Sequence, residues 1–173
     1  MILGMSTGLF TGIHVVLSLI GIAAGFMVLF GMMGGKKLPS WTAWFFISNI
    51  LTDVTGFLFP FKGITPGIII GFLSLVVLAV AMIGYYVKRL AGSWRARYII
   101  TTAIALWFNV FVLIVQSFEK IQALKDIAPT QASPVFGITQ LAALVLLIIL
   151  TVVAYRRFRP AAAVRTPLQS TAK

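Results

Sequence analysis

Five unbroken apolar runs follow one another along the chain, separated by short polar connections. A helix of roughly 20 apolar residues crosses about 30 Å of hydrocarbon, and each run is at least that long. The runs predict transmembrane helices over residues 8–33, 41–60, 65–87, 98–118 and 135–155. The fold class expected is therefore all-α, a polytopic membrane protein whose bundle of five transmembrane helices forms one domain at residues 1–159, followed by a flexible basic cytoplasmic tail at 160–173.

Basic residues in the connections predict the orientation. Residues 34–40 contain two Lys or Arg, residues 88–97 contain four, and the chain after Tyr155 contains five. The other two connections are nearly neutral, since one has Lys62 and the other balances two lysines with Glu119 and Asp126. Short loops rich in Lys and Arg stay in the cytoplasm. We therefore expect the N-terminus outside the cytoplasm and the C-terminus inside.

Composition agrees with a lipid-embedded chain. Of the 173 residues 60% are hydrophobic and 10% charged, and the mean hydropathy is +1.05, which leaves too little polar surface for a soluble globule. The net charge of +11 lies between the apolar runs and not along one solvated face, so we expect no nucleic-acid partner. The chain has no cysteine, which excludes disulfides, thiol catalysis and iron–sulfur clusters.

Polar side chains inside the predicted spans are the first candidates for function, because such groups are costly in lipid. His14 in the first span and Asp53 in the second lie at about the same depth, roughly 10 Å from the outer boundary at about 1.5 Å per residue. Their equal depth allows the two to meet, and three interpretations are open. They satisfy each other or nearby hydroxyls and so link two helices, they form a proton or ligand site, or one of them faces a partner subunit. The further site candidates are Asn49, Asn109, Gln116 and Gln140.

Glycines recur at spacings that let helices approach closely, as Gly21 and Gly25 do in the first span and Gly67 and Gly71 in the third. Such small residues are typical of helix-packing faces in membranes. They predict close contacts between spans.

Known intramembrane chemistries fit this set of residues poorly. A haem between helices needs two axial ligands, and His14 is the sole histidine, leaving only methionines such as Met27, Met32 or Met82 as a second ligand. One histidine and one intramembrane aspartate are too few for a zinc or iron site. No nucleophile elbow, phosphate loop or acid/base carboxylate pair is present in the sequence. We expect no catalytic residue, no metal and no required cofactor.

Four stretches carry a resemblance to a known family. They are HVVLSLIGI at 14–22, WTAW at 41–44 with TDVTGFLFP at 52–60, NVFVLIVQ at 109–116, and APTQ at 128–131. The chain up to about Arg159 resembles a family of small uncharacterised bacterial multi-pass integral membrane proteins. The resemblance implies the bacterial inner membrane and brings no activity. In the family a serine often stands at the position of Asp53, and a histidine often follows the second span where this chain has Gly67 and Ile68, which argues against Asp53 as a family-wide catalytic residue.

Three functional hypotheses follow. The first is a non-enzymatic accessory or interaction subunit, whose partners besides the lipid bilayer are other membrane subunits or further copies of the chain. The second is a small proton or solute transporter or channel that uses the polar outer half of the bundle. The third is a redox-complex subunit that contributes to a quinone or haem site through His14.

Overall fold

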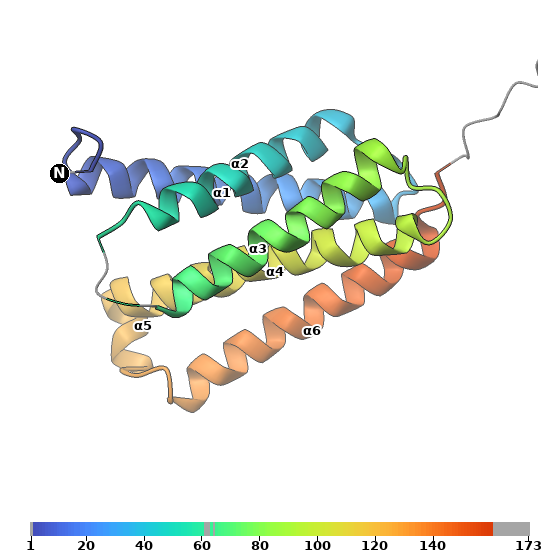
Figure 1. Ribbon diagram of the computed structural model, residues 1–173. Helices are drawn as coiled ribbons and strands as arrows, with labels where there is room; N and C mark the ends of the chain where they lie inside the picture. The colour runs from blue at the N-terminus through green and yellow to red at the C-terminus, as the bar shows by residue number, and fades with distance from the viewer. Residues whose placement is uncertain (1, 61–62, 64, 161–173) are drawn as a thin grey trace, which may run out of the picture.

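The computed structural model describes residues 2–60, 63 and 65–160, and over these residues the regular elements are helices and no strand occurs. The all-α prediction is confirmed. The tail at 160–173 lies outside the described residues except for Pro160. The helices are α1 Thr7–Met33, α2 Pro39–Phe57, α3 Pro66–Met82 with the π-helical turn η1 Ile83–Val87, α4 Trp94–Lys120, the short α5 Gln122–Ile127, and α6 Pro134–Arg157 (Figure 1).

Helix boundaries follow from local chemistry. The Ser6 side chain accepts a hydrogen bond from the Leu9 amide and so caps α1. Proline is the first residue of α2, α3 and α6, where its fixed φ suits a helix and its missing N–H is no loss. Gly35 has a φ of +70° just after α1, a conformation that glycine adopts without strain. The predicted spans match these helices to within a few residues.

Four helices are long and apolar enough to cross a membrane: α1, α3 with η1, α4 and α6. The chain thus has the helices of a membrane protein. The helix α2, over which the sequence predicts a fifth span, contains 19 residues and has no stretch as apolar as those in the other four, and its Thr42, Ser48, Asn49 and Thr52 are buried. Its polar side chains lower its hydropathy.

The helices α1 and α4 are the central elements of the bundle. The first packs against α2, α4 and α6, and the second against α1, α3 and α6, while α2 and α3 also contact each other. Glycines allow these approaches, since a Cβ at Gly25 would lie 2.8 Å from the Leu106 side chain and one at Gly71 would lie 3.2 Å from Phe57. The predicted packing role of glycine is confirmed at Gly21, Gly25 and Gly71, whereas Gly67 meets only its neighbour Thr65.

The main hydrophobic core occupies one half of the bundle, the half that contains the C-terminal parts of α1 and α6 and the N-terminal part of α4. Its largest buried side chains include Leu29, Met32, Phe45, Tyr98 and Leu106. In the other half of the bundle, Phe10 is the sole buried side chain of α1 before Gly21. The part of α1 before Gly21 therefore packs less closely against other helices than the part after it.

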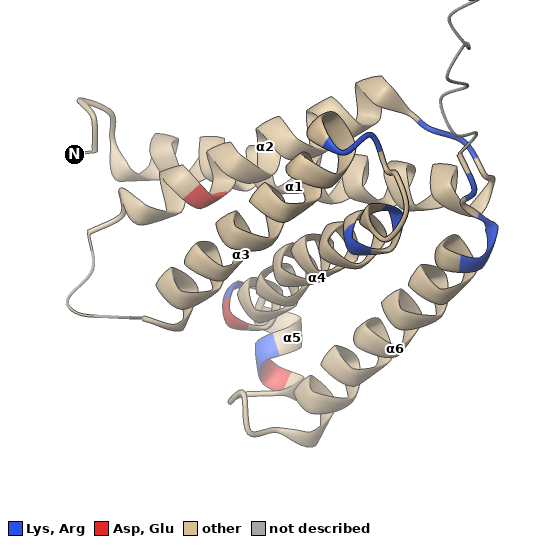
Figure 2. Ribbon diagram, turned by 45° about the vertical axis from the view of Figure 1, so that its right-hand side comes forward, with Lys and Arg blue, Asp and Glu red and all other residues tan. Residues whose placement is uncertain are grey.

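Basic residues gather at the end of the bundle nearest this core (Figure 2). The connections at this end lie close to one another. The Arg95 guanidinium donates to the Tyr155 and Phe158 carbonyls at 2.8 and 2.7 Å, and a Cβ at Gly35 would lie 3.6 Å from the Arg157 carbonyl. The connections around residues 34–40 and 88–97 and the end of α6 thus lie on the same side, as the charge pattern predicts. We call this the basic end of the molecule, and the opposite end the outer end.

Candidate polar site inside the bundle

An asparagine pair links α2 to α4 at the middle of the bundle. Asn109 Nδ2 donates to Asn49 Oδ1, and Asn49 Nδ2 donates to the Phe45 carbonyl at 2.7 Å. Asn49 is fully buried, and Ser18 of α1 donates to Asn109 Oδ1 at 3.5 Å. Three helices therefore meet at one polar layer. Buried amides that satisfy each other in this way hold helices in register.

The imidazole of His14 is bonded to Thr55 of α2. Its Nδ1 lies 2.8 Å from Thr55 Oγ1, and Thr55 Oγ1 also lies 2.7 Å from the Leu51 carbonyl. A hydroxyl has one hydrogen, so it donates either to the Leu51 carbonyl, in which case His14 Nδ1 donates to the hydroxyl, or to Nδ1 itself. Phe59 packs edge-on against the ring at 5.3 Å.

A direct bond between His14 and Asp53 is therefore the wrong alternative, and the other structural alternative, a bond to a nearby hydroxyl, is the one observed for His14. Residues 53 and 55 lie about 200° apart around a helix, because each residue turns it by about 100°. Thr55 faces α1, whereas the polar group next to the carboxyl of Asp53 is the Ser74 hydroxyl of α3. Equal depth placed the two groups at the same level but could not determine which way α2 is rotated.

Two polar atoms beside this region lack a partner. Asp53 Oδ2 and Thr52 Oγ1 are buried, and neither has a hydrogen-bond partner in the described chain. An unpaired polar atom away from water costs free energy. A water molecule, a proton or a polar ligand next to these atoms would supply the missing partner.

The remaining candidates lie apart from this region. Gln140 of α6 is buried and donates to the Phe111 carbonyl of α4 at 3.2 Å, and its Oε1 has no partner in the described chain. Gln116 is exposed on α4. The structure thus brings Asn49 and Asn109 together, uses Gln140 as a link between α4 and α6, and leaves Gln116 outside.

Sequence reasoning missed two partners, Thr55 and Ser74. Both are hydroxyl residues within apolar runs, and such residues commonly bond to their own backbone, as Thr55 does with Leu51. The spacing of these hydroxyl residues along the sequence did not indicate that they contact His14 and Asp53. Over the described residues, no group of three or more His, Cys, Asp or Glu side chains converges in a way that would hold a metal ion.

No family model matches the chain, and no curated protein or solved structure matches it either.

Proposed function

We propose that this chain is a non-enzymatic integral membrane protein of the bacterial inner membrane that acts as an accessory or interaction subunit. In this proposal it crosses the bilayer five times, with the N-terminus outside and the basic end in the cytoplasm. The gathering of the basic connections at one end supports this orientation, because positively charged loops stay in the cytoplasm. The resemblance described above supports the bacterial inner membrane.

The helix α2 is the fifth crossing in this proposal. Its 19 residues extend over about 28 Å at about 1.5 Å per residue, close to the thickness of the hydrocarbon. Its polar residues Asn49 and Thr52 are buried against other helices, while Trp44, Ile47 and Leu51 are exposed. A helix that turns its polar face inward and its apolar face outward can cross lipid in spite of a low mean hydropathy.

The observation that carries the subunit role is the unfilled face of α1 in its outer half. A Cβ at Gly21 or Gly25 would meet atoms at 2.9 Å or less, whereas one at Gly8 or Gly12 would meet nothing within 4 Å. Glycine in a helix costs about 1 kcal/mol relative to alanine, and in membranes it serves to let another helix approach. Gly12 lies well inside α1, so we propose that a partner helix packs there.

Cysteine cross-linking in native membranes tests the subunit role, because the chain has no cysteine of its own. We expect a Gly12→Cys variant to form a cross-linked product larger than the chain alone, while Phe72→Cys on the exposed face of α3 forms none. A product of twice the mass of the chain would identify the partner as a second copy. Equal behaviour of the two variants would contradict the proposal.

The second candidate function is transport of protons or a small polar solute, and the unpaired Asp53 Oδ2 and Thr52 Oγ1 favour it. If the chain transports, liposomes that contain it alone should show a flux, and Asp53→Asn should remove that flux. The conservative Thr55→Ser change keeps the hydroxyl next to His14 and should leave the flux unchanged. Liposomes without flux would remove this candidate and leave the subunit role.

A further inference from the structure

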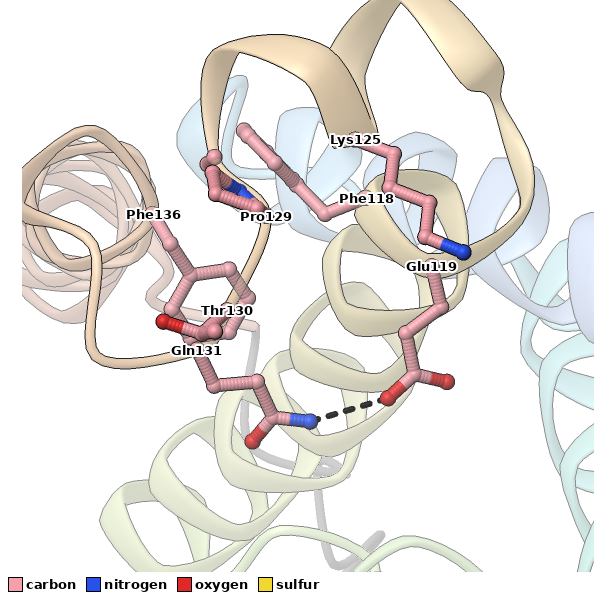
Figure 3. Close-up of a pocket in the computed structure, with 8 residues that line it drawn as sticks. Phe118, Glu119, Lys125, Pro129, Thr130, Gln131 and Phe136 are labelled. Atoms are coloured by element: carbon pink, nitrogen blue, oxygen red, sulfur yellow. Dashed lines mark hydrogen bonds between the residues drawn. The ribbon is translucent and has the colours of Figure 1, made fainter.

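A second polar region lies at the outer end of the bundle, where α4 ends, α5 crosses and α6 begins. There the structure has a cavity of about 290 Å³, close to the lower limit of about 300 Å³ for small-molecule sites. Its lining residues are Phe118, Glu119, Lys125, Ala128, Pro129, Thr130, Gln131 and Phe136 (Figure 3). This cavity is separate from the Asn49, His14 and Asp53 groups described above.

One wall of the cavity is apolar and well built. Phe118 and Phe136 are buried and pack edge to face at 5.5 Å, and Ala128 is buried beside them. These residues form their own small hydrophobic cluster, apart from the main core. The cluster fixes α6 against the end of α4, so the shape of the cavity does not depend on a single loose side chain.

The other wall carries two opposite charges. In Figure 3, Glu119 and Lys125 lie on one side of the view, and Phe136 and Pro129 lie on the other. Gln131 Nε2 donates to Glu119 Oε1 at 2.9 Å, which holds one carboxylate oxygen in place. Figure 3 marks one hydrogen bond among the side chains drawn, from Gln131 to Glu119, and none between Glu119 and Lys125. The two charges are not bonded to each other, so both can bind an external ligand.

We infer that this cavity binds a zwitterionic phosphoethanolamine group, with its ammonium at Glu119, its phosphate at Lys125, and adjoining carbon atoms against Phe118 and Phe136. Phosphate accepts hydrogen bonds from lysine, and an ammonium donates to a carboxylate. A single anion would be repelled by Glu119, and a single cation by Lys125, so the pair of charges selects a molecule that carries both.

The position of the cavity agrees with this chemistry. It lies where two apolar helices end, which is the depth of lipid headgroups at a bilayer surface. The phosphoethanolamine group has two sources, the headgroup of phosphatidylethanolamine and the free soluble compound. The inference stands independently of the partner helix proposed at Gly12, which lies on α1.

The test purifies the full chain in detergent from liposomes made of equal parts phosphatidylethanolamine and phosphatidylglycerol. We expect the lipids retained on the purified protein to be enriched in phosphatidylethanolamine by roughly fivefold, the effect of a contact worth about one surface ion pair. Glu119→Gln keeps an acceptor for Gln131 and should remove the enrichment. Lys125→Gln should lower the retention of both lipids, because both contain phosphate.

Matched controls come from neighbouring charges that do not line the cavity. Asp126→Asn removes one negative charge from α5, and Lys120→Gln removes one positive charge from the end of α4. Both variants should retain the enrichment of the unaltered chain. Equal retention of the two lipids by the unaltered chain, together with no binding of free phosphoethanolamine, would overturn the inference. Cavity variants that behave like the controls would overturn it too.

A second arm distinguishes the sources. Free phosphoethanolamine is added to the chain in nanodiscs that contain only phosphatidylglycerol, and its binding is measured by equilibrium dialysis. Binding that Glu119→Gln abolishes, without enrichment of the lipid in the first arm, assigns the site to the soluble compound. Enrichment of the lipid without binding of the soluble compound assigns it to the headgroup.

Discussion

At the scale of single residues, polar side chains inside the bundle act mainly as links between helices. Asn49 and Asn109 satisfy each other across α2 and α4, and His14 is bonded to Thr55 across α1 and α2. In a membrane such links contribute modestly, by about 0.6 kcal/mol on average and up to about 1.7 kcal/mol in measured cases.

The asparagine pair predicts non-additive stability. Asn49→Ala and Asn109→Ala should each lower the free energy of unfolding, by about 1–2 kcal/mol, because each strands a buried amide. The double variant should lose less than the sum, with a coupling of roughly 0.6–1.7 kcal/mol. Unfolding in mixed micelles measures these values. The control pair of Asn49 with the exposed Gln116 should be additive, and additivity at Asn109 would contradict the contact.

The bond between His14 and Thr55 predicts a second pattern. His14→Ala and Thr55→Ala should couple, because the two side chains share a hydrogen bond. His14→Ala and Asp53→Asn should add to within a few tenths of a kcal/mol, since Asp53 faces Ser74. The same unfolding assay separates the two pairs. Strong coupling between the His14 and Asp53 substitutions would instead support a direct contact between these residues, as their equal depth suggests.

Close helix approach predicts the effect of a single methyl group. Gly21→Ala would place a Cβ 2.9 Å from Asn49 Nδ2 and 3.2 Å from Ser48 Oγ, and Asn49 is held by its own hydrogen bonds. We expect a loss of about 1–3 kcal/mol, the usual effect of overpacking. Gly137→Ala in α6 is the matched control, because its methyl group meets nothing within 4 Å. Thermal unfolding would show a lowered Tm for Gly21→Ala alone.

The sequence predicted part of this site. Asn49, Asn109, His14 and Asp53 were identified because polar groups within apolar runs are rare and costly. Their pairing was not predictable, because depth along a helix can be counted from the sequence whereas rotation about its axis depends on packing. Gly21, Gly25 and Phe45 set that rotation through contacts between helices. Thr55 and Ser74 resemble ordinary hydroxyl residues of membrane helices.

At the scale of elements, the helices themselves were predictable from apolar run length and from the prolines at their first positions. The short α5 was missed, because its six residues are too few to show a helical period. The helix α2 is the element whose role depends most on context. Its polar face is buried against α1 and α4, so its composition alone understates its compatibility with lipid.

Reporter fusions test whether α2 crosses the membrane. We expect fusions after Gly35, Ser93 and Lys173 to report the cytoplasm, and fusions at Gly63 and Ala128 to report the opposite side. The reason is the excess of Lys and Arg in the connections at the basic end. A cytoplasmic signal at Gly63 would show that α2 does not cross. A cytoplasmic signal at Ala128 would contradict the orientation of α4 and α6.

At the scale of the whole molecule, the bundle is tightly packed near its basic end and open near its outer end. The main core and the links through Arg95 close the basic end, whereas the outer half of α1 has one buried side chain before Gly21. This asymmetry was not visible in the sequence, because an apolar residue that faces lipid cannot be told by its type from one that faces another helix. It is the reason for placing a partner helix against Gly12.

The size of the particle in native membrane nanodiscs tests this central claim most directly. The account predicts that the unaltered chain is recovered in a complex heavier than the 18.8 kDa of one copy, and that Gly12→Leu reduces it to one copy that is still folded. The small-to-large change Ala142→Leu, at an exposed position of α6, should leave the complex intact. A single copy recovered from the unaltered chain, or a complex that survives Gly12→Leu, would contradict the account.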